Sequence, residues 1–222
     1  MGPFAWFKWE ALFRDWRVFA EGFSFTILAS ILALLLALAL GVIFGVFSTT
    51  NNKLLKGTSR VYVEFIQNTP LLIQVFFLYN GLPHLGIMLN VFTVGVLGVG
   101  VYHGAYIAEV VRAGIQAIPR GQMEAAHSQG FNHLQTMRHI ILPQAMKVVL
   151  PPLTNQAVSL IKNTSVMAMV AGGELMYHAD SWSSNNLYYG PAYVTVALLY
   201  LILCFPLAKL AQRLEERSGA AT

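Results

Sequence analysis

Long stretches without charge constrain the fold of this chain more than any other feature. Residues 23–47, 65–108 and 181–208 contain no Asp, Glu, Lys or Arg. A helix that crosses a membrane needs about 20 predominantly apolar residues, and each stretch is longer than that. Charged residues make up 11% of the chain, compared with about 25% in typical soluble domains. The composition therefore predicts a polytopic membrane protein and excludes a soluble enzyme.

Five transmembrane helices are expected from this pattern, so the predicted class is an all-α membrane protein. The stretch 65–108 is too long for one crossing, and Gly81, Pro83 and Gly86 divide it, because Pro and Gly end helices. The helices are expected at about residues 23–47, 61–82, 90–115, 148–172 and 191–210. The fourth is interrupted by the polar residues 162–165.

The distribution of Lys and Arg predicts how the chain is oriented, because cytoplasmic loops carry an excess of these residues. One set of segments contains Lys53, Lys56, Arg60, Arg120, Arg138, Lys147, Lys209, Arg213 and Arg217, and the other contains Lys8, Arg14 and Arg17. The first set comprises the loops around residues 48–60 and 116–147 and the C-terminal tail. We therefore expect the C-terminus and the loop 116–147 in the cytoplasm and the N-terminus outside.

The N-terminal segment, residues 1–22, mixes aromatic and charged side chains. Among its charges it carries the aromatic residues Phe4, Trp6, Phe7, Trp9, Phe13 and Trp16. An interfacial helix is favoured over a disordered tail, because aromatic residues concentrate where membrane meets water. The acidic residues here argue against a cleaved signal peptide, so the first helix is expected to be retained. A transmembrane domain is expected at residues 23–217 and a tail at 218–222.

The polar loop at residues 119–145 predicts two short helices. Gly130 can end the first helix in the left-handed conformation. Asn132 is expected to cap the second helix, with Gln135 completing a capping box, and Pro143 is expected to close it. Taken alone, such a pair of helices is usually a loop that packs on its own domain.

The letters of this loop resemble the EAA motif of bacterial ABC importer permeases. The match consists of Glu124-Ala125-Ala126, then Gly130, then Ile140-x-Leu142-Pro143 at the family's spacing. Three neighbouring segments resemble the polar amino acid uptake branch, whose members transport His, Glu, Gln or Arg. They are AYIAEVVRAGIQAIPRGQ from residue 105, LPPLTNQAVSLIKNTS from residue 150 and NTPLLIQVFFLYNGLP from residue 68. The resemblance covers about residues 22–217.

The resemblance implies a type I ABC importer permease fold in which this loop is a coupling helix on a cytoplasmic ATPase. Glu124 would pair with a partner Arg, the two alanines would permit close approach, and Gly130 would make the turn. The implied coupling residues are Gly121, Glu124, Ala125, Ala126, Gly130, Leu142 and Pro143. Closure of the ATPase dimer would then rock the helices between two states.

No phosphate loop of the form Gly-x4-Gly-Lys-Ser/Thr occurs in this chain. Another subunit is therefore expected to bind the ATP that drives transport. ATP and Mg are expected on a partner ATPase, so this chain is expected to be no enzyme and to carry no cofactor of its own. The implied assembly contains two ATP-binding cassette subunits, a second permease copy or homologue, and an extracytoplasmic solute-binding protein. The basic residues are too dispersed for a nucleic-acid site.

A substrate path is expected near two polar groups inside the membrane. Lys162 is the clearest, since a charge at mid-bilayer costs about 2.5–3.5 kcal/mol on insertion scales. Its polar neighbours Asn163, Thr164 and Ser165 favour a local break in the helix. A snorkelling lysine, or a pair with Glu64 or Glu174, is an equal alternative. Asn68, Thr69 and Gln74 are further candidates, for which hydrogen bonding between helices is favoured over substrate binding.

Other candidate sites are weaker still. Glu109 and Arg112 are expected to form a structural pair within one helix. The spacing of the six His residues predicts no metal site, and the single Cys204 cannot form an intrachain disulfide. The family commonly has Asp where this chain has Asn163, which leaves open whether the substrate is glutamate or glutamine or a basic amino acid. A secondary transporter driven by an ion gradient and a small channel subunit are the alternative functions.

Overall fold

Every regular element of the described residues, 2–219, is helical, as the sequence predicts. The structure is a computed structural model. Its elements are α1 (Trp6–Arg14), α2 (Trp16–Thr49), α3 (Lys53–Gln67), α4 (Leu71–Phe76), η1 (Phe77–Gly81), η2 (Leu82–Leu85), α5 (Val91–Gln116), α6 (Arg120–Ser128), α7 (His133–Thr136), η3 (Met137–Ile141), α8 (Leu142–Asn163), η4 (Thr164–Val170), α9 (Leu175–Asn186) and α10 (Tyr189–Gly219). Residues 220–222 of the expected tail lie outside the described residues.

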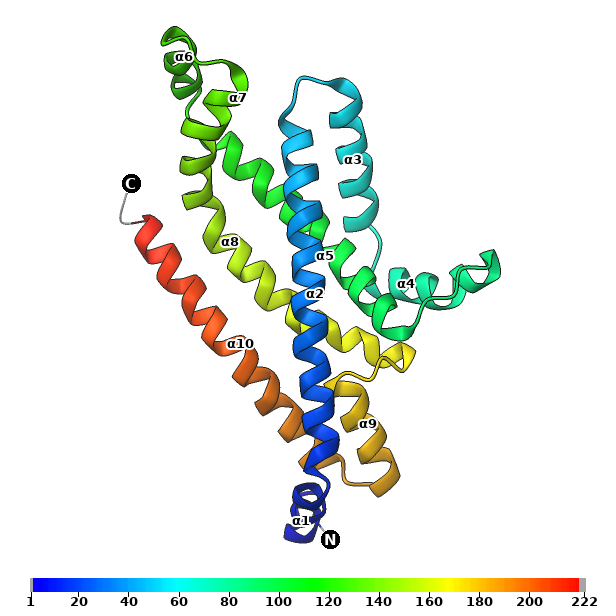
Figure 1. Cartoon of the computed structure of the whole chain (residues 1–222). Coiled ribbons are helices and arrows are strands. Elements are labelled where there is room, and N and C mark those ends of the chain that lie inside the picture. The colour runs from blue at the N-terminus through cyan, green and yellow to red at the C-terminus, as the bar shows by residue number, and fades with distance from the viewer. Residues whose placement is uncertain (1, 220–222) are drawn as a thin grey trace.

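The long helix α2 is the spine of the molecule, and α5 crosses it closely (Figure 1). The contact is close because small residues line it. A Cβ atom added at Gly45 would lie 2.6 Å from Val111 Cβ and 2.9 Å from the Ala108 carbonyl oxygen. Ala33 and Ala37 are buried in the same cluster. Small residues allow helix backbones to approach in membranes, where packing replaces the hydrophobic effect between helices.

The prediction of one continuous helix at residues 61–82 is wrong. The chain instead forms α3, turns by 99° at a short break, and continues as α4, η1 and η2. Pro70 lies at this break as the N-cap of α4, and the residue before a proline disfavours the helical conformation. The segment α4 to η2 therefore projects sideways from the bundle as an arm (Figure 1).

Three helices of the described residues are long and apolar enough to cross a membrane: α2, α5 and α10. The bent pair α3–α4 makes a fourth if it counts as one span. Five crossings and the expected orientation of the termini therefore remain predictions. Helix α8 has 22 residues, but it carries Lys147, Asn155 and Gln156, which lower its hydropathy.

The fourth predicted helix breaks where its polar residues occur. Helix α8 ends at Asn163 and the chain continues as the 3-10 helix η4. It also begins earlier than expected, because Pro143 lies in its first turn instead of closing the preceding helix. Proline is tolerated there, since the first amide groups of a helix have no partner within the helix.

Two helix boundaries at the chain ends differ from the sequence-based ones. Residues 16–22, expected in the interfacial segment, are the first turns of α2, and only α1 forms a separate helix. The polar residues 212–217 continue α10, which was expected to end near Leu210. Arg213 and the other charges there favour rather than stop a helix.

The two ends of the molecule carry different elements (Figure 1). The end that carries the α2–α3 turn, α6 and α7 is called the loop end below. The opposite end, called the N-terminal end, carries α1, α9 and the turn into α10. A cluster containing Leu12, Phe19, Trp182 and Val196 joins α1, α2, α9 and α10 there.

Candidate functional site

The loop between α5 and α8 has the local structure that its sequence predicts. Gly130 follows the first helix with a φ of 84°, a conformation that costs an L-residue about 1–2 kcal/mol. Asn132 then caps α7, because its side chain accepts a hydrogen bond from the Gln135 amide while the Gln135 side chain accepts one from the Asn132 amide. Both bonds measure 2.9 Å. The turn between the two helices is thus held in one shape.

The first loop helix presents most of its surface outward. Glu124 and Ala125 are exposed, whereas Ala126 is 2% exposed and faces the protein. The Gln144 side chain donates to the Ile140 carbonyl at 2.9 Å and to Gln122 at 3.4 Å, which ties α6 to the start of α8. The expected coupling residues Gly121, Glu124, Ala125 and Gly130 therefore share an exposed part of the loop end.

Leu142 and Pro143 are exposed as well, but they occupy the start of α8. Elements α7, η3 and α8 follow one another without a gap from His133 to Asn163. A helical rod, interrupted only by the wider π turn at η3, thus links the loop to the break at residues 162–165.

Polar side chains at the elbow between α3 and α4 are used to end α3. Asn68 Nδ2 donates to the Glu64 carbonyl at 2.7 Å, and Thr69 Oγ1 to the Phe65 carbonyl at 2.8 Å. Gln74 Nε2 donates to the Ile66 and Thr69 carbonyls, both at 3.0 Å. Carbonyl groups at the end of a helix lack partners within it. These three residues therefore support the elbow, and their role toward a substrate stays a prediction.

The break after α8 is stabilised by its own side chains. Thr164 Oγ1 donates to the Ile161 carbonyl and Ser165 Oγ to the Lys162 carbonyl, both at 2.7 Å. Thr164 is fully buried, whereas Lys162 is exposed. Hydroxyl groups that bond to backbone carbonyls weaken the regular helix, so the break expected from the sequence is present.

Neither acidic partner considered for Lys162 is bonded to it. Glu64 forms an ion pair with Arg60 at 2.7 Å, and Glu174 accepts hydrogen bonds from two amide groups and Tyr200. The side chain of Lys162 instead lies on the open face of α8. A role for this ammonium group in substrate binding stays a prediction.

The elbow and the break are neighbours in space although they are far apart in the sequence. Leu71 and Val75 of α4 pack with Val94 of α5 and Val170 of η4 in one buried cluster. The two groups of polar path candidates therefore flank a common apolar core. On α5, the expected structural pair is confirmed, since Arg112 Nε donates to Glu109 Oε2 at 2.9 Å.

Comparison with known proteins agrees with this architecture. Residues 37–219 match the family model described as "Binding-protein-dependent transport system inner membrane component". The chain belongs to this family. The resemblance noted in the sequence is thereby confirmed, and the chain is a multi-pass component of the inner membrane.

Individual relatives cover almost the whole chain. It is 47% identical over 206 residues to the probable glutamine ABC transporter permease protein GlnM of Bacillus subtilis, covering 93% of this chain and 95% of that protein. It is 32% identical over 213 residues to the glutamine transport system permease protein GlnP of Escherichia coli K12, covering 95% and 97%.

Solved structures show the same fold. A chain in a crystal structure of an amino acid ABC transporter with histidines has a TM-score of 0.86 and 32% identity, covering 93% of this chain and 97% of that one. A chain of the MetNI methionine ABC transporter in an inward-facing conformation, at 18% identity, has a TM-score of 0.65, which supports the fold alone.

A buried histidine, His103, links α5 and α8 of this family member, although no sequence motif predicts a role for it. His103 is 1% exposed. Its Nδ1 lies 3.2 Å from Gln156 Oε1, and its Nε2 lies 3.0 Å from Asn163 Nδ2. As these amides are oriented, the ring donates from Nδ1 and accepts at Nε2, so it holds the Asn163 side chain by its amide nitrogen. Its burial came from the helix crossing, and spacing along the sequence carried no signal for it.

A second buried polar residue, Glu174, was considered only as a partner for Lys162. It is the N-cap of α9, and its carboxylate accepts from the Met176 and Tyr177 amides at 2.8 and 2.7 Å and from Tyr200 Oη at 2.8 Å. Burial raises the pKa of this carboxyl group, and the three donors offset part of that rise because they favour the ionised form. Glu174 thus connects the start of α9 to α10.

Proposed function

We propose that this chain is the membrane subunit of an ATP-driven ABC importer for polar amino acids. It forms half of the translocation path by alternating access, and a second permease copy or homologue forms the other half. Two ATP-binding cassette subunits bind ATP and Mg and dock on the loop at residues 119–145. An extracytoplasmic solute-binding protein delivers the substrate to the opposite side.

The observation that carries this proposal is the connection between the exposed loop and the helix break. Helix α6 buries Ala126 against its own domain and leaves Glu124 and Ala125 exposed, so that these two residues are accessible to a docking ATPase. The helical run from His133 to Asn163 then leads from this loop to the polar break beside Lys162. A push on α6 would therefore move the break, which is the mechanical coupling that an ATPase-driven importer requires.

Glutamine is the first substrate to test, because the relatives GlnM and GlnP are named for it. The path candidates Lys162, Asn163 and Gln74 offer an ammonium group and two amides. An ammonium group suits the carboxylate of an amino acid, and amide groups suit a neutral polar side chain.

Reconstitution tests the proposal. The chain is placed in proteoliposomes with its cognate ATPase and binding protein, and uptake of radiolabelled glutamine is measured with and without ATP. We expect uptake that requires ATP hydrolysis and persists when ion gradients are collapsed. Uptake that continues without the ATPase subunit, or stops when the ion gradient is collapsed, would show a channel or a secondary transporter instead.

A further inference from the structure

We propose that the N-terminal end of the molecule is a phospholipid-binding surface that lies in the headgroup layer of the membrane. Four exposed aromatic side chains, called the aromatic collar here, define this surface. They are Phe4, Trp6, Phe13 and Trp16, with exposed fractions of 57%, 69%, 60% and 57%. The inference concerns membrane seating and does not depend on the identity of the transported substrate.

The opposite side of α1 is fixed to the protein, so the collar is held in place. Leu12 is 4% exposed in the cluster with Trp182. Trp182 Nε1 donates to Asp15 Oδ2 at 2.9 Å, and the rings of Phe7 and Tyr188 pack edge to face at 5.7 Å. Helix α1 therefore has one side that packs on α9 and on the turn into α10, and another side on which Trp6 and Phe13 are exposed.

The length of α2 places the collar outside the hydrocarbon core. Its 34 residues span about 51 Å at 1.5 Å per residue, whereas the hydrocarbon core of a bilayer is about 30 Å thick. The ends of α2 therefore emerge from the core. Its exposed Leu28, Ile31 and Leu35 suit contact with acyl chains, and Trp16 lies about three helical turns beyond Leu28, on the side of the charged Arg17 and Glu21. Trp is enriched where membrane meets water.

The first turns of α2 form a groove whose polarity changes along the helix. Trp16, Arg17 and Glu21 line one part, and Phe25 and Leu28 line the part nearer the membrane core. Within the described residues the ion pairs are Arg14–Asp15, Arg60–Glu64 and Arg112–Glu109, so the charges of Arg17 and Glu21 are available to a ligand.

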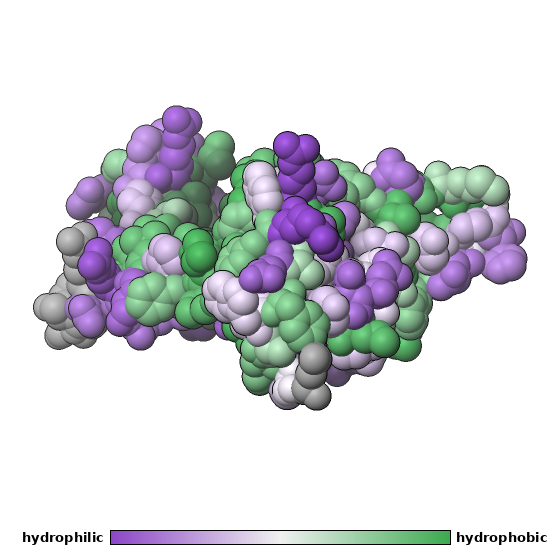
Figure 2. All heavy atoms as spheres, turned by 90° about the horizontal axis from the view of Figure 1, so that it is seen from below, coloured by the Kyte–Doolittle hydropathy of each residue, from purple (hydrophilic) through white to green (hydrophobic). Residues whose placement is uncertain are grey.

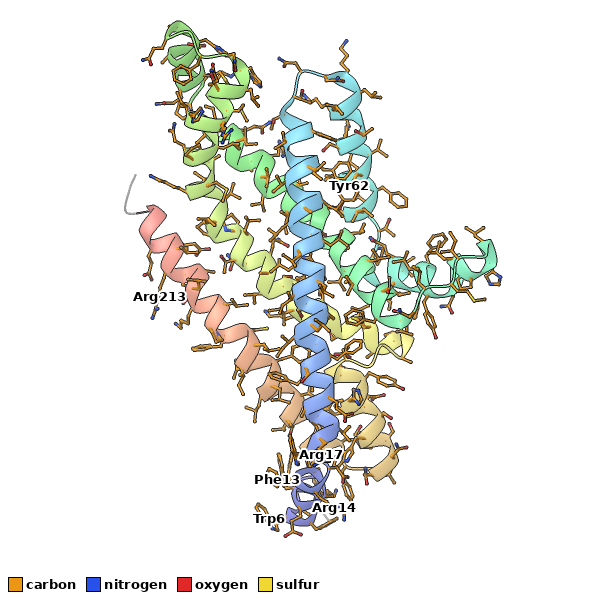
Figure 3. The ribbon with its side chains drawn as sticks, in the orientation of Figure 1. Trp6, Phe13, Arg14, Arg17, Tyr62 and Arg213 are labelled. Atoms are coloured by element: carbon orange, nitrogen blue, oxygen red, sulfur yellow. The ribbon has the colours of Figure 1, made fainter. Side chains whose placement is uncertain are left out.

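This order of groups matches a phospholipid. A guanidinium group binds phosphate, a carboxylate binds the ammonium group of a zwitterionic headgroup, and the apolar part contacts the acyl chain. Figure 3 shows Trp6, Phe13, Arg14 and Arg17 together at this end. Figure 2, a view of the same end, shows hydrophilic and hydrophobic side chains interleaved instead of an uninterrupted polar cap.

Tryptophan fluorescence gives a direct test, because all four tryptophans of the chain, Trp6, Trp9, Trp16 and Trp182, lie at this end. Variants that retain only Trp6, only Trp16 or only Trp182 are made by replacing the other three with Phe, and a variant lacking all four supplies the background. Each full-length variant is reconstituted in nanodiscs of phosphatidylcholine brominated near the top of the acyl chain or near its end. Aqueous iodide is the second quencher.

We expect Trp6 and Trp16 to lose a several-fold larger fraction of their emission to the shallow bromines than to the deep ones, with little loss to iodide. Trp182, which is 6% exposed, is the matched buried control and should be quenched weakly by both. The proposal is overturned if iodide quenches Trp6 and Trp16 strongly while brominated lipid leaves them unchanged.

Coverage by a protein partner is distinguished in the same experiment. The Trp-free variant allows the background of the other subunits to be subtracted, so the assembled transporter can be measured as well. Loss of lipid quenching in the assembly would mean that a protein covers the collar, which also overturns the proposal. If one single-tryptophan variant fails to fold, the other still decides between lipid and water.

Discussion

At the scale of single residues, the polar side chains inside this protein serve either the backbone or one another. Asn68, Thr69 and Gln74 satisfy the carbonyl groups at the end of α3. His103 satisfies two amide side chains on α8. An unsatisfied buried polar group costs about 1–3 kcal/mol, so the contacts of the buried His103 matter most for stability, whereas Asn68 is exposed and can bond to solvent instead.

His103→Leu is expected to destabilise the protein by about 1–3 kcal/mol, because it removes the hydrogen-bond partner that the half-buried side chains of Gln156 and Asn163 share. His103→Gln, which keeps a donor and an acceptor, should cost less. The unfolding midpoint in detergent measures both. His84→Leu, at an exposed position, is the control. Equal midpoints for His103→Leu and the wild type would show that the contacts contribute nothing.

Glu124→Lys is expected to abolish ATP-dependent uptake while membrane insertion and the unfolding midpoint stay unchanged, because the side chain is exposed and reverses its charge at the proposed docking surface. Glu216→Lys makes the same charge change at an exposed position of α10 and should transport normally. The measurements are uptake in proteoliposomes and co-purification of the ATPase. Normal docking and uptake in Glu124→Lys would contradict the proposed role of the loop.

Gly130→Asp should also abolish coupled uptake, for a different reason. The φ of 84° at this position costs an L-residue about 1–2 kcal/mol, so the turn between α6 and α7 would relax into another shape. Insertion should again be unaffected, since no atom lies within 4 Å of a Cβ added there. Wild-type uptake in this variant would show that the shape of the turn is unimportant.

At the scale of elements, the crossing of α2 and α5 depends on missing side chains. Gly41 and Gly45 of α2 face Ile107 and Val111 of α5 at distances that leave no room for a Cβ atom. Polar side chains act at two other places, the elbow between α3 and α4 and the break after α8. There they donate to backbone carbonyls and so replace helical hydrogen bonds. Both features set where helices meet and end.

The glycine contact gives a paired prediction. Gly45→Ala is expected to destabilise the protein by about 1–3 kcal/mol, the usual cost of overpacking, because the new methyl group would lie 2.9 Å from the Ala108 carbonyl oxygen. Gly57→Ala, in α3 with nothing within 4 Å, should stabilise it by up to about 1 kcal/mol through helix propensity. Unfolding midpoints that shift in the same direction would refute the packing argument.

At the scale of the whole molecule, the distribution of Lys and Arg predicts that the two ends face different compartments. The α2–α3 turn and the loop at 119–145 share the loop end, whereas α1 and α9 share the other (Figure 1). The positive charges gather at the loop end, which we expect in the cytoplasm.

Cysteine labelling checks this orientation. The native Cys204 is buried and is first replaced by Ala. Asn51→Cys, in the turn after α2, and Ser184→Cys, in α9, are both at exposed positions. On intact cells a membrane-impermeant maleimide should label the Ser184→Cys variant and spare the Asn51→Cys variant, which should react only after the membrane is opened. The reverse pattern would invert the predicted topology.

Local sequence was sufficient for the features that depend on neighbours in the chain. The apolar stretches predict long helices because burial in lipid requires them, and Gly130, Asn132 and Gln135 predict the turn because capping involves residues a few positions apart. The break at Lys162 to Ser165 follows from the same local hydrogen-bonding chemistry. These are properties of short segments, whatever surrounds them.

Tertiary structure decided the features that depend on contacts between distant segments. The place where the chain packs after the elbow, the burial of His103 and the hydrogen bond from Tyr200 to Glu174 depend on contacts between helices, and hydropathy along the chain does not record such contacts. The charge-free stretch at residues 65–108 therefore indicated two crossings, but it could not show that the first bends by 99°. The size of the bend depends on where the turned segment packs, and Leu71 and Val75 pack with Val94 and Val170, which lie far along the chain.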